Sequence, residues 1–142
     1  LIRAGRYNEA LPVFELLAEQ NPRKPGVLNN LAMLYQMKGD DRAIDAAQRA
    51  YDLAPRNPLY ADTLGWILVR RGSTEQGLAV LREAQSRQAD LPDLAYHIAV
   101  ALNDLGRSEQ ARIELEQALT TGVDFPEIED AKKLLTDLKS RR

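Results

Sequence analysis

Small and apolar residues recur along this chain with the spacing of a helix face. In four stretches they stand four and then three positions apart: Ala10, Phe14, Leu17; Ala43, Ala47, Ala50; Gly77, Leu81, Ala84; Ala111, Leu115, Ala118. This spacing puts the side chains on one side of an α-helix. It predicts amphipathic helices at about residues 7–20, 41–53, 75–88 and 108–120.

A further helix is predicted before each of the last three stretches. Their apolar positions are Leu28, Leu31, Ala32, Tyr35; Ala61, Leu64, Gly65, Leu68; Ala95, Ile98, Ala99, Leu102. Proline is tolerated at the first helical position, so we expect helices to begin at Pro25, Pro58, Pro92 and Pro126. Glycine adopts the left-handed conformation most easily, so Gly39, Gly72 and Gly106 are expected to end helices.

The helix pair is itself repeated. Gly5, Gly39, Gly72 and Gly106 recur every 33 or 34 residues, as do the four prolines just named. A period of this size indicates a solenoid of stacked helix pairs. The turn from Gly39 to Ala43 is one residue shorter than its counterparts, so a tighter turn or a shortened helix is expected there.

These copies resemble the tetratricopeptide repeat, which combines W-x2-L-G-x2-Y, A-x3-F and a closing proline. No aromatic residue fills the leading position, and Ala89 replaces one closing proline. The resemblance implies an all-α, right-handed α-solenoid of antiparallel helix pairs, with about three and a half repeats and a C-terminal capping helix, in one domain. The expected parts are 1–22 (second half of a truncated repeat), 25–55, 58–89 and 92–122 (full repeats) and 126–140 (capping helix). Gly65 and Gly77 are expected where two helix backbones nearly touch.

Composition narrows the function. The chain has 19 basic and 21 acidic residues, a formal charge of −2, one histidine and no cysteine. A charge near zero does not recruit nucleic acid, and no apolar run is long enough for this segment to insert into a membrane. One histidine and no thiol predict no catalytic residues, no metal and no cofactor. The acidic pairs Asp40–Asp41 and Glu129–Asp130 are interpreted as solvated surface.

Partner binding is the function that the resemblance implies, because the first helix of each tetratricopeptide pair lines a concave groove. The predicted groove residues are Asn29, Asn30, Met33, Met37, Asp62, Trp66, Arg70, Tyr96, His97, Val100 and Asn103. The same outward faces carry Gln36, Leu59, Thr63, Val69 and Asp93. Trp66 is either an aromatic anchor for a partner or packed between repeats. His97 either lines the groove or is a partly exposed residue whose charge is favoured by Asp93.

One familiar mode of binding is disfavoured. Chaperone-binding members of the family grip a C-terminal carboxylate with lysine, arginine and asparagine. Here Asp62 and Asp93 occupy the corresponding faces and would repel a carboxylate.

A narrower resemblance concerns the parent protein. The segments LNNLAMLYQMKGDDRAIDAAQRAYDLAP, DTLGWILVRRG, YHIAVALNDLGRSEQARIELEQAL and FPEIEDAKKLL are similar to the C-terminal part of tetratricopeptide lipoproteins linked to bacterial PEP-CTERM sorting and exopolysaccharide export. This resemblance implies a longer, lipid-anchored periplasmic parent with further repeats upstream; otherwise a cytoplasmic location is expected. Two functions stay open: a scaffold that binds a segment of another protein, and a self-assembly module.

Overall fold

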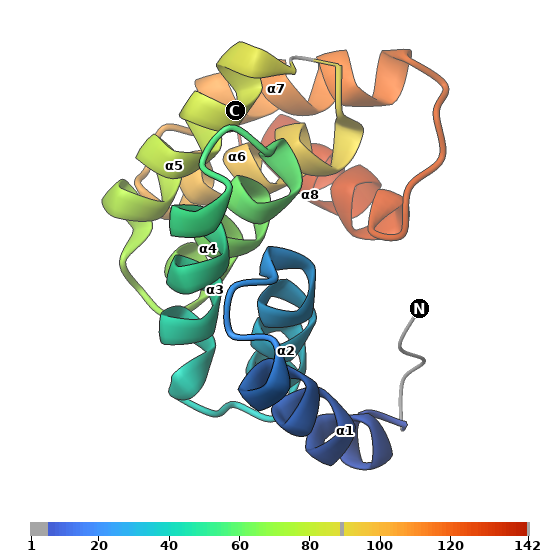
Figure 1. Cartoon of the computed structure of the whole chain (residues 1–142). Helices are drawn as coiled ribbons and strands as arrows, with labels where there is room; N and C mark the ends of the chain where they lie inside the picture. Colours follow the sequence, from blue (N-terminus) through green and yellow to red (C-terminus); the bar gives the residue numbers. More distant parts are fainter. Residues whose placement is uncertain (1–5, 89, 142) are drawn as a thin grey trace.

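The computed structural model describes residues 6–88 and 90–141. The predictions for Gly5, the rest of residues 1–5 and Ala89 therefore fall outside the described residues. Within the described ranges there are eight α-helices and no strand (Figure 1): α1 (Tyr7–Gln20), α2 (Pro25–Met37), α3 (Arg42–Leu53), α4 (Pro58–Arg70), α5 (Thr74–Arg87), α6 (Pro92–Asp104), α7 (Ser108–Thr120) and α8 (Ile128–Ser140).

Proline and glycine set most helix ends as predicted. Pro25, Pro58 and Pro92 are the first residues of α2, α4 and α6. Gly39, Gly72 and Gly106 follow the ends of these helices with positive φ angles of 68°, 91° and 78°, where a side chain would be strained. The shortened helix is also confirmed, because α3 has 12 residues whereas the other described helices have 13 or 14.

The prediction for Pro126 is wrong. This proline lies in a turn, and α8 begins two residues later at Ile128. The backbone N–H of Ile128 donates to the carbonyl of Phe125 at 3.1 Å, which closes a turn ahead of the helix. Phe125 is buried, so the turn also anchors the link between α7 and α8.

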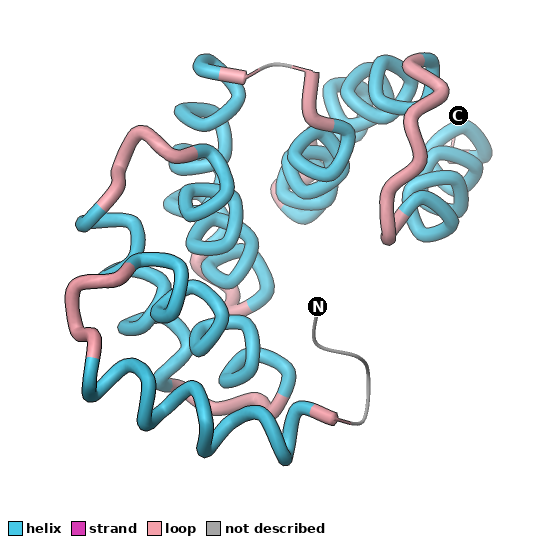
Figure 2. The backbone as a smooth tube through the Cα atoms, turned by 45° about the vertical axis from the view of Figure 1, so that its right-hand side comes forward, coloured by secondary structure: helices cyan, strands magenta, loops and turns pink. Residues whose placement is uncertain are grey.

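The helices stack as an α-solenoid of antiparallel pairs. α2 packs on α3, α4 on α5, and α6 on α7, while α1 contacts α2 and α8 contacts α7. The first helices of neighbouring pairs also touch, since α2 contacts α4 and α4 contacts α6. Figure 2 shows that the successive pairs follow an arc.

Two helix backbones approach each other closely at Gly65 in α4 and Gly77 in α5. A Cβ atom on Gly77 would lie 2.7 Å from the carbonyl oxygen of Gly65 and 3.0 Å from the backbone nitrogen of Val69. A Cβ on Gly65 would lie 3.0 Å from the carbonyl oxygen of Gly77. The predicted contact is confirmed, and it places α4 firmly against α5.

Candidate protein-binding groove

A hollow of about 370 Å³ crosses the first helices of the solenoid. Its lining comes from α2, α4, α6 and the turn before α8: Met33, Gln36, Leu59, Asp62, Thr63, Trp66, Ile67, Asp93, His97, Pro126 and Glu127. Met33 is 40% exposed and Leu59 is 57% exposed. Large apolar side chains thus meet solvent in a recess with polar side chains around it.

A second hollow of about 680 Å³ adjoins the first and shares Leu59, Asp62 and Asp93 with it. Its other lining residues come from the starts of α4 and α6 and from the links before α6 and α8: Asn57, Pro58, Gln88, Leu91, Pro92, Leu94, Val123 and Asp124. Because three residues are common to both hollows, they form one continuous surface. We call the two hollows together the groove.

His97 lies in the wall of the groove between two carboxylates. Its Nδ1 is 2.6 Å from Oδ1 of Asp62, and its Nε2 is 2.7 Å from Oε1 of Glu127. The residue is only 6% exposed, so the prediction of a partly exposed side chain is wrong. The carboxylates that bond to it come from α4 and from the turn before α8, whereas Asp93, one turn earlier, interacts with it through its charge.

The two hydrogen bonds favour the charged imidazolium. A carboxylate only accepts, so both ring nitrogens of His97 donate at once only when the ring is protonated. Burial disfavours that charge, but the bonds to Asp62 and Glu127 outweigh burial and raise the pKa of His97 to about 9. The bridge is therefore an ion triad of one cation and two anions.

Trp66 packs between repeats and also lies at the groove, while its role as an anchor for a partner stays a prediction. It lines the groove, and its ring stacks on His97 of the next pair, with ring centroids 4.1 Å apart and planes inclined by 19°. Tyr96 lies tilted against it at 6.0 Å, and the guanidinium of Arg70 lies 5.4 Å from its ring centroid. Trp66 consequently joins two repeats while keeping part of its ring at the groove.

The charge of the groove is negative. Asp62, Asp93, Asp124 and Glu127 line it, and no lysine or arginine of the described residues does. Asp93 is half-buried, and its burial first, then the charge of Asp62, raises the pKa of its carboxyl above the ordinary value.

Four of the eleven predicted residues line the groove: Met33, Asp62, Trp66 and His97. Asn29 and Tyr96 do not line the groove, and both are buried. The Asn29 amide points along its own helix to the sulfur of Met33, 3.8 Å away.

The remaining predicted residues lie outside the groove lining. Asn103 is held from the end of α8, where Nη1 of Arg141 donates to its Oδ1 at 2.9 Å. Met37 and Arg70 are exposed at the end of their helices, and Asn30 and Val100 are half-buried. Their predicted contact with a partner stays a prediction.

Among the neighbouring outward positions, Gln36, Leu59, Thr63 and Asp93 do line the groove. Val69 does not, because it is buried against α5, where its Cγ2 would be 2.8 Å from a Cβ on Gly77. The close approach of α4 and α5 therefore turns this position inward.

One wall of the groove was missed from sequence. It is the link from α7 to α8, which contributes Val123, Asp124, Pro126 and Glu127. A signal was available for Glu127, which follows Pro126 just as Asp93 follows Pro92 in the repeat period. Because the link lacks the repeat signature, it attracted no site prediction.

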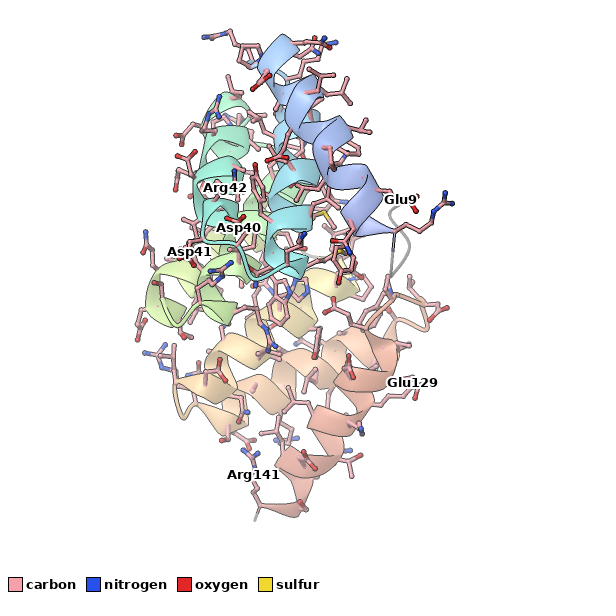
Figure 3. The ribbon with its side chains drawn as sticks, turned by 90° about the horizontal axis from the view of Figure 1, so that it is seen from below. Glu9, Asp40, Asp41, Arg42, Glu129 and Arg141 are labelled. Carbon is pink, nitrogen blue, oxygen red and sulfur yellow. The ribbon has the colours of Figure 1, made fainter. Side chains whose placement is uncertain are left out.

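The turn between α2 and α3 carries a separate charged cluster on the surface (Figure 3). Nη2 of Arg42 lies 2.8 Å from Asp40, and this guanidinium lowers the pKa of the Asp40 carboxyl to about 2. Arg71 at the end of α4 lies 2.7 Å from Asp41 and donates to the backbone carbonyl of Asp40 at 2.7 Å. The cluster thus fastens the short turn to the next helix pair.

Two other kinds of site are absent from the part of the chain that the structure describes. It contains no group of three or more histidine or acidic side chains arranged to hold a metal ion. None of its helices combines the length and apolar character that crossing a bilayer requires.

The fold and the groove together define an all-helical repeat protein with a groove across its first helices. The chain belongs to the tetratricopeptide repeat family, whose model matches residues 1–58 and 63–124.

Photosystem I assembly protein Ycf3 of Prochlorococcus marinus (strain MIT 9211) is 38% identical over 76 residues, which are 51% of this chain and 44% of that protein. The chain spans about half the length of the curated relatives it matches.

Two solved structures illustrate the shared fold. The tetratricopeptide protein TTC0263 of Thermus thermophilus superposes with a TM-score of 0.78 at 25% identity, over 94% of this chain and 73% of that one. YrrB, described as a tetratricopeptide protein with an unusual peptide-binding site, gives a TM-score of 0.75 at 20% identity, over 89% and 66%.

Proposed function

We propose that this chain is a non-catalytic scaffold that binds a segment of another protein in its groove. The observation that carries the proposal is the exposure of Met33 and Leu59 in a continuous recess. Apolar side chains that are exposed together and rimmed by polar ones are typical of protein interaction sites. Three comparisons are consistent with a scaffold role. The chain belongs to the tetratricopeptide repeat family, the Ycf3 relatives are named as assembly proteins, and YrrB is described as having a peptide-binding site.

The chemistry of His97 supports a non-catalytic role. A general base needs a free ring nitrogen, whereas both nitrogens of His97 are bonded to carboxylates. The residue therefore holds the wall of the groove.

The test uses Leu59→Glu, which places a charge at an exposed apolar position of the groove. Ile113→Glu in α7 is the matched control, because Ile113 is 46% exposed and does not line the groove. Captured partners from an extract of the source organism should be lost with Leu59→Glu and kept with Ile113→Glu. Equal capture by both variants would contradict the proposal. Trp66→Ala is a weaker test, because Trp66 also packs between repeats.

Self-association is the alternative, and the outer face of α1 favours it. Val13 and Leu16 there are 56% and 54% exposed. If copies associate through this face, Leu16→Glu should dissociate them in sedimentation velocity while Leu59→Glu should not. The opposite pattern would favour the groove.

We further propose that the parent protein belongs to a bacterial exopolysaccharide or PEP-CTERM system and is periplasmic and lipid-anchored. The support is the resemblance of the four sequence segments given above. Fractionation of cells that express the full-length protein checks this. Its recovery in the cytoplasm would contradict the proposal.

A further inference from the structure

We propose that the segment bound by the groove is basic and apolar: it places a lysine or arginine side chain against Asp93 and Asp124, and an apolar side chain beside Leu59. The inference rests on the proposed function and identifies the chemical class of its partner.

The first support is the imbalance of charge. Asp62, Asp93, Asp124 and Glu127 line the groove without a lysine or arginine among its described lining residues. The cationic side chain in that lining, His97, is already shared between Asp62 and Glu127. This one cation faces four carboxylates, Asp93 included, so the described lining keeps an excess of negative charge around Asp93 and Asp124. Complementary charge across an interface selects partners and raises the association rate.

The second support is the environment of Asp93. Its carboxyl is partly withdrawn from water and faces the charge of Asp62. Both effects disfavour its ionised form, and they outweigh the opposing charge of His97, since the pKa of the carboxyl is raised. A cation from a partner would offset them, whereas an anion such as a C-terminal carboxylate would be repelled. The groove therefore discriminates between basic and acidic segments.

The third support is the position of the apolar residues. Leu59 lies in both hollows, next to Asp62 and Asp93, while Leu91 and Val123 line the hollow that contains Asp124. Lysine and arginine pack their aliphatic stems on apolar surface and keep the charged end at polar groups. The groove offers both kinds of contact within one recess.

The first experiment selects ligands without assuming their sequence. A phage-displayed library of random twelve-residue peptides is panned against the immobilised chain, with the Leu59→Glu chain as the counter-selection. We expect the selected peptides to be enriched in lysine or arginine beside leucine, isoleucine, methionine or phenylalanine.

The second experiment measures the affinity of the strongest selected peptide for variants. Removing both charges with Asp93→Asn and Asp124→Asn should weaken binding on the order of tenfold, and added salt should weaken wild-type binding. The matched control is Asp45→Asn with Asp137→Asn, two exposed carboxylates of α3 and α8 outside the groove. This control should change the affinity less than about twofold.

The outcomes separate the inference from the proposed function. Selected peptides that are acidic or uncharged, and that Leu59→Glu abolishes, would overturn the basic partner and leave groove binding intact. Basic peptides that bind the Asp93→Asn, Asp124→Asn chain as well as the wild type would also overturn the inference. A library that yields no peptide sensitive to Leu59→Glu would overturn both.

Discussion

His97 connects three parts of the chain through two hydrogen bonds. Asp62 belongs to α4, His97 to α6, and Glu127 to the turn before α8. A buried charge is costly unless it is paired and hydrogen-bonded. The two carboxylates meet that condition, so the charged form of His97 stabilises the joint between the last two pairs and α8.

This bridge predicts a loss of stability in alkaline solution. The ordinary pKa of about 6.5 in the unfolded chain is below the value of about 9 in the folded chain. The folded state therefore holds the proton more tightly than the unfolded chain. The protonated ring contributes fully to the free energy of unfolding below about pH 6.5, and this contribution is lost as the pH rises through about 9. From about pH 6 to about pH 9.5 the free energy of unfolding should fall on the order of 3 kcal/mol, as measured by urea denaturation.

The control is His97→Gln, which has no titrating ring. Its free energy of unfolding should be lower at about pH 6 but nearly constant across the same range. A wild-type protein as insensitive to pH as His97→Gln would show that the imidazolium bridge does not form.

The bonds from His97 to its two partners were not predicted from the sequence. The partners lie 35 residues before and 30 residues after it, whereas a helical pattern relates only positions three or four apart. The helical pattern therefore pointed to Asp93, four residues before His97, whereas the hydrogen bonds of His97 go to Asp62 and Glu127.

At the scale of elements, the helix ends were predictable because their causes are local. Proline at the first position and glycine with positive φ act through their own backbone. Pro126 has the same spacing, but the buried side chain of Phe125 fixes a turn around it. The groove wall formed by that link was missed for the same reason, because its position depends on tertiary packing.

The contact between α4 and α5 gives a second prediction. Gly77→Ala should destabilise the protein by about 1 to 3 kcal/mol, since its Cβ would meet backbone atoms of Gly65 and Val69 that cannot move independently. Gly26→Ala in α2 is the control, because its Cβ would have only the Tyr60 hydroxyl, at 3.6 Å, nearby. Thermal unfolding of the two variants checks this, and equal melting temperatures would contradict the close contact.

At the scale of the whole molecule, the arc is completed by α8. Ala131, Leu138 and Phe125 are buried in the same cluster as residues of α6 and α7. Ile128, Leu134 and Leu135 pack against that cluster. The apolar stripe of α8 therefore covers the last helix pair, α6 and α7. The link between α7 and α8 supplies a wall of the groove and one hydrogen-bond partner of His97.

Removal of residues 124–142 should therefore affect both solubility and stability. The deletion exposes apolar surface of α6 and α7, and solenoids with an uncovered end associate. It also leaves Nε2 of His97 without Glu127. We expect light scattering to show species larger than the parent chain, and thermal unfolding to begin at a lower temperature. Deleting only residues 141–142 is the control, since Arg141 contributes the exposed bond to Asn103, and it should change neither result. A chain lacking residues 124–142 that matches the parent in size and melting temperature would show that α8 is an appendage to a solenoid already complete at α7.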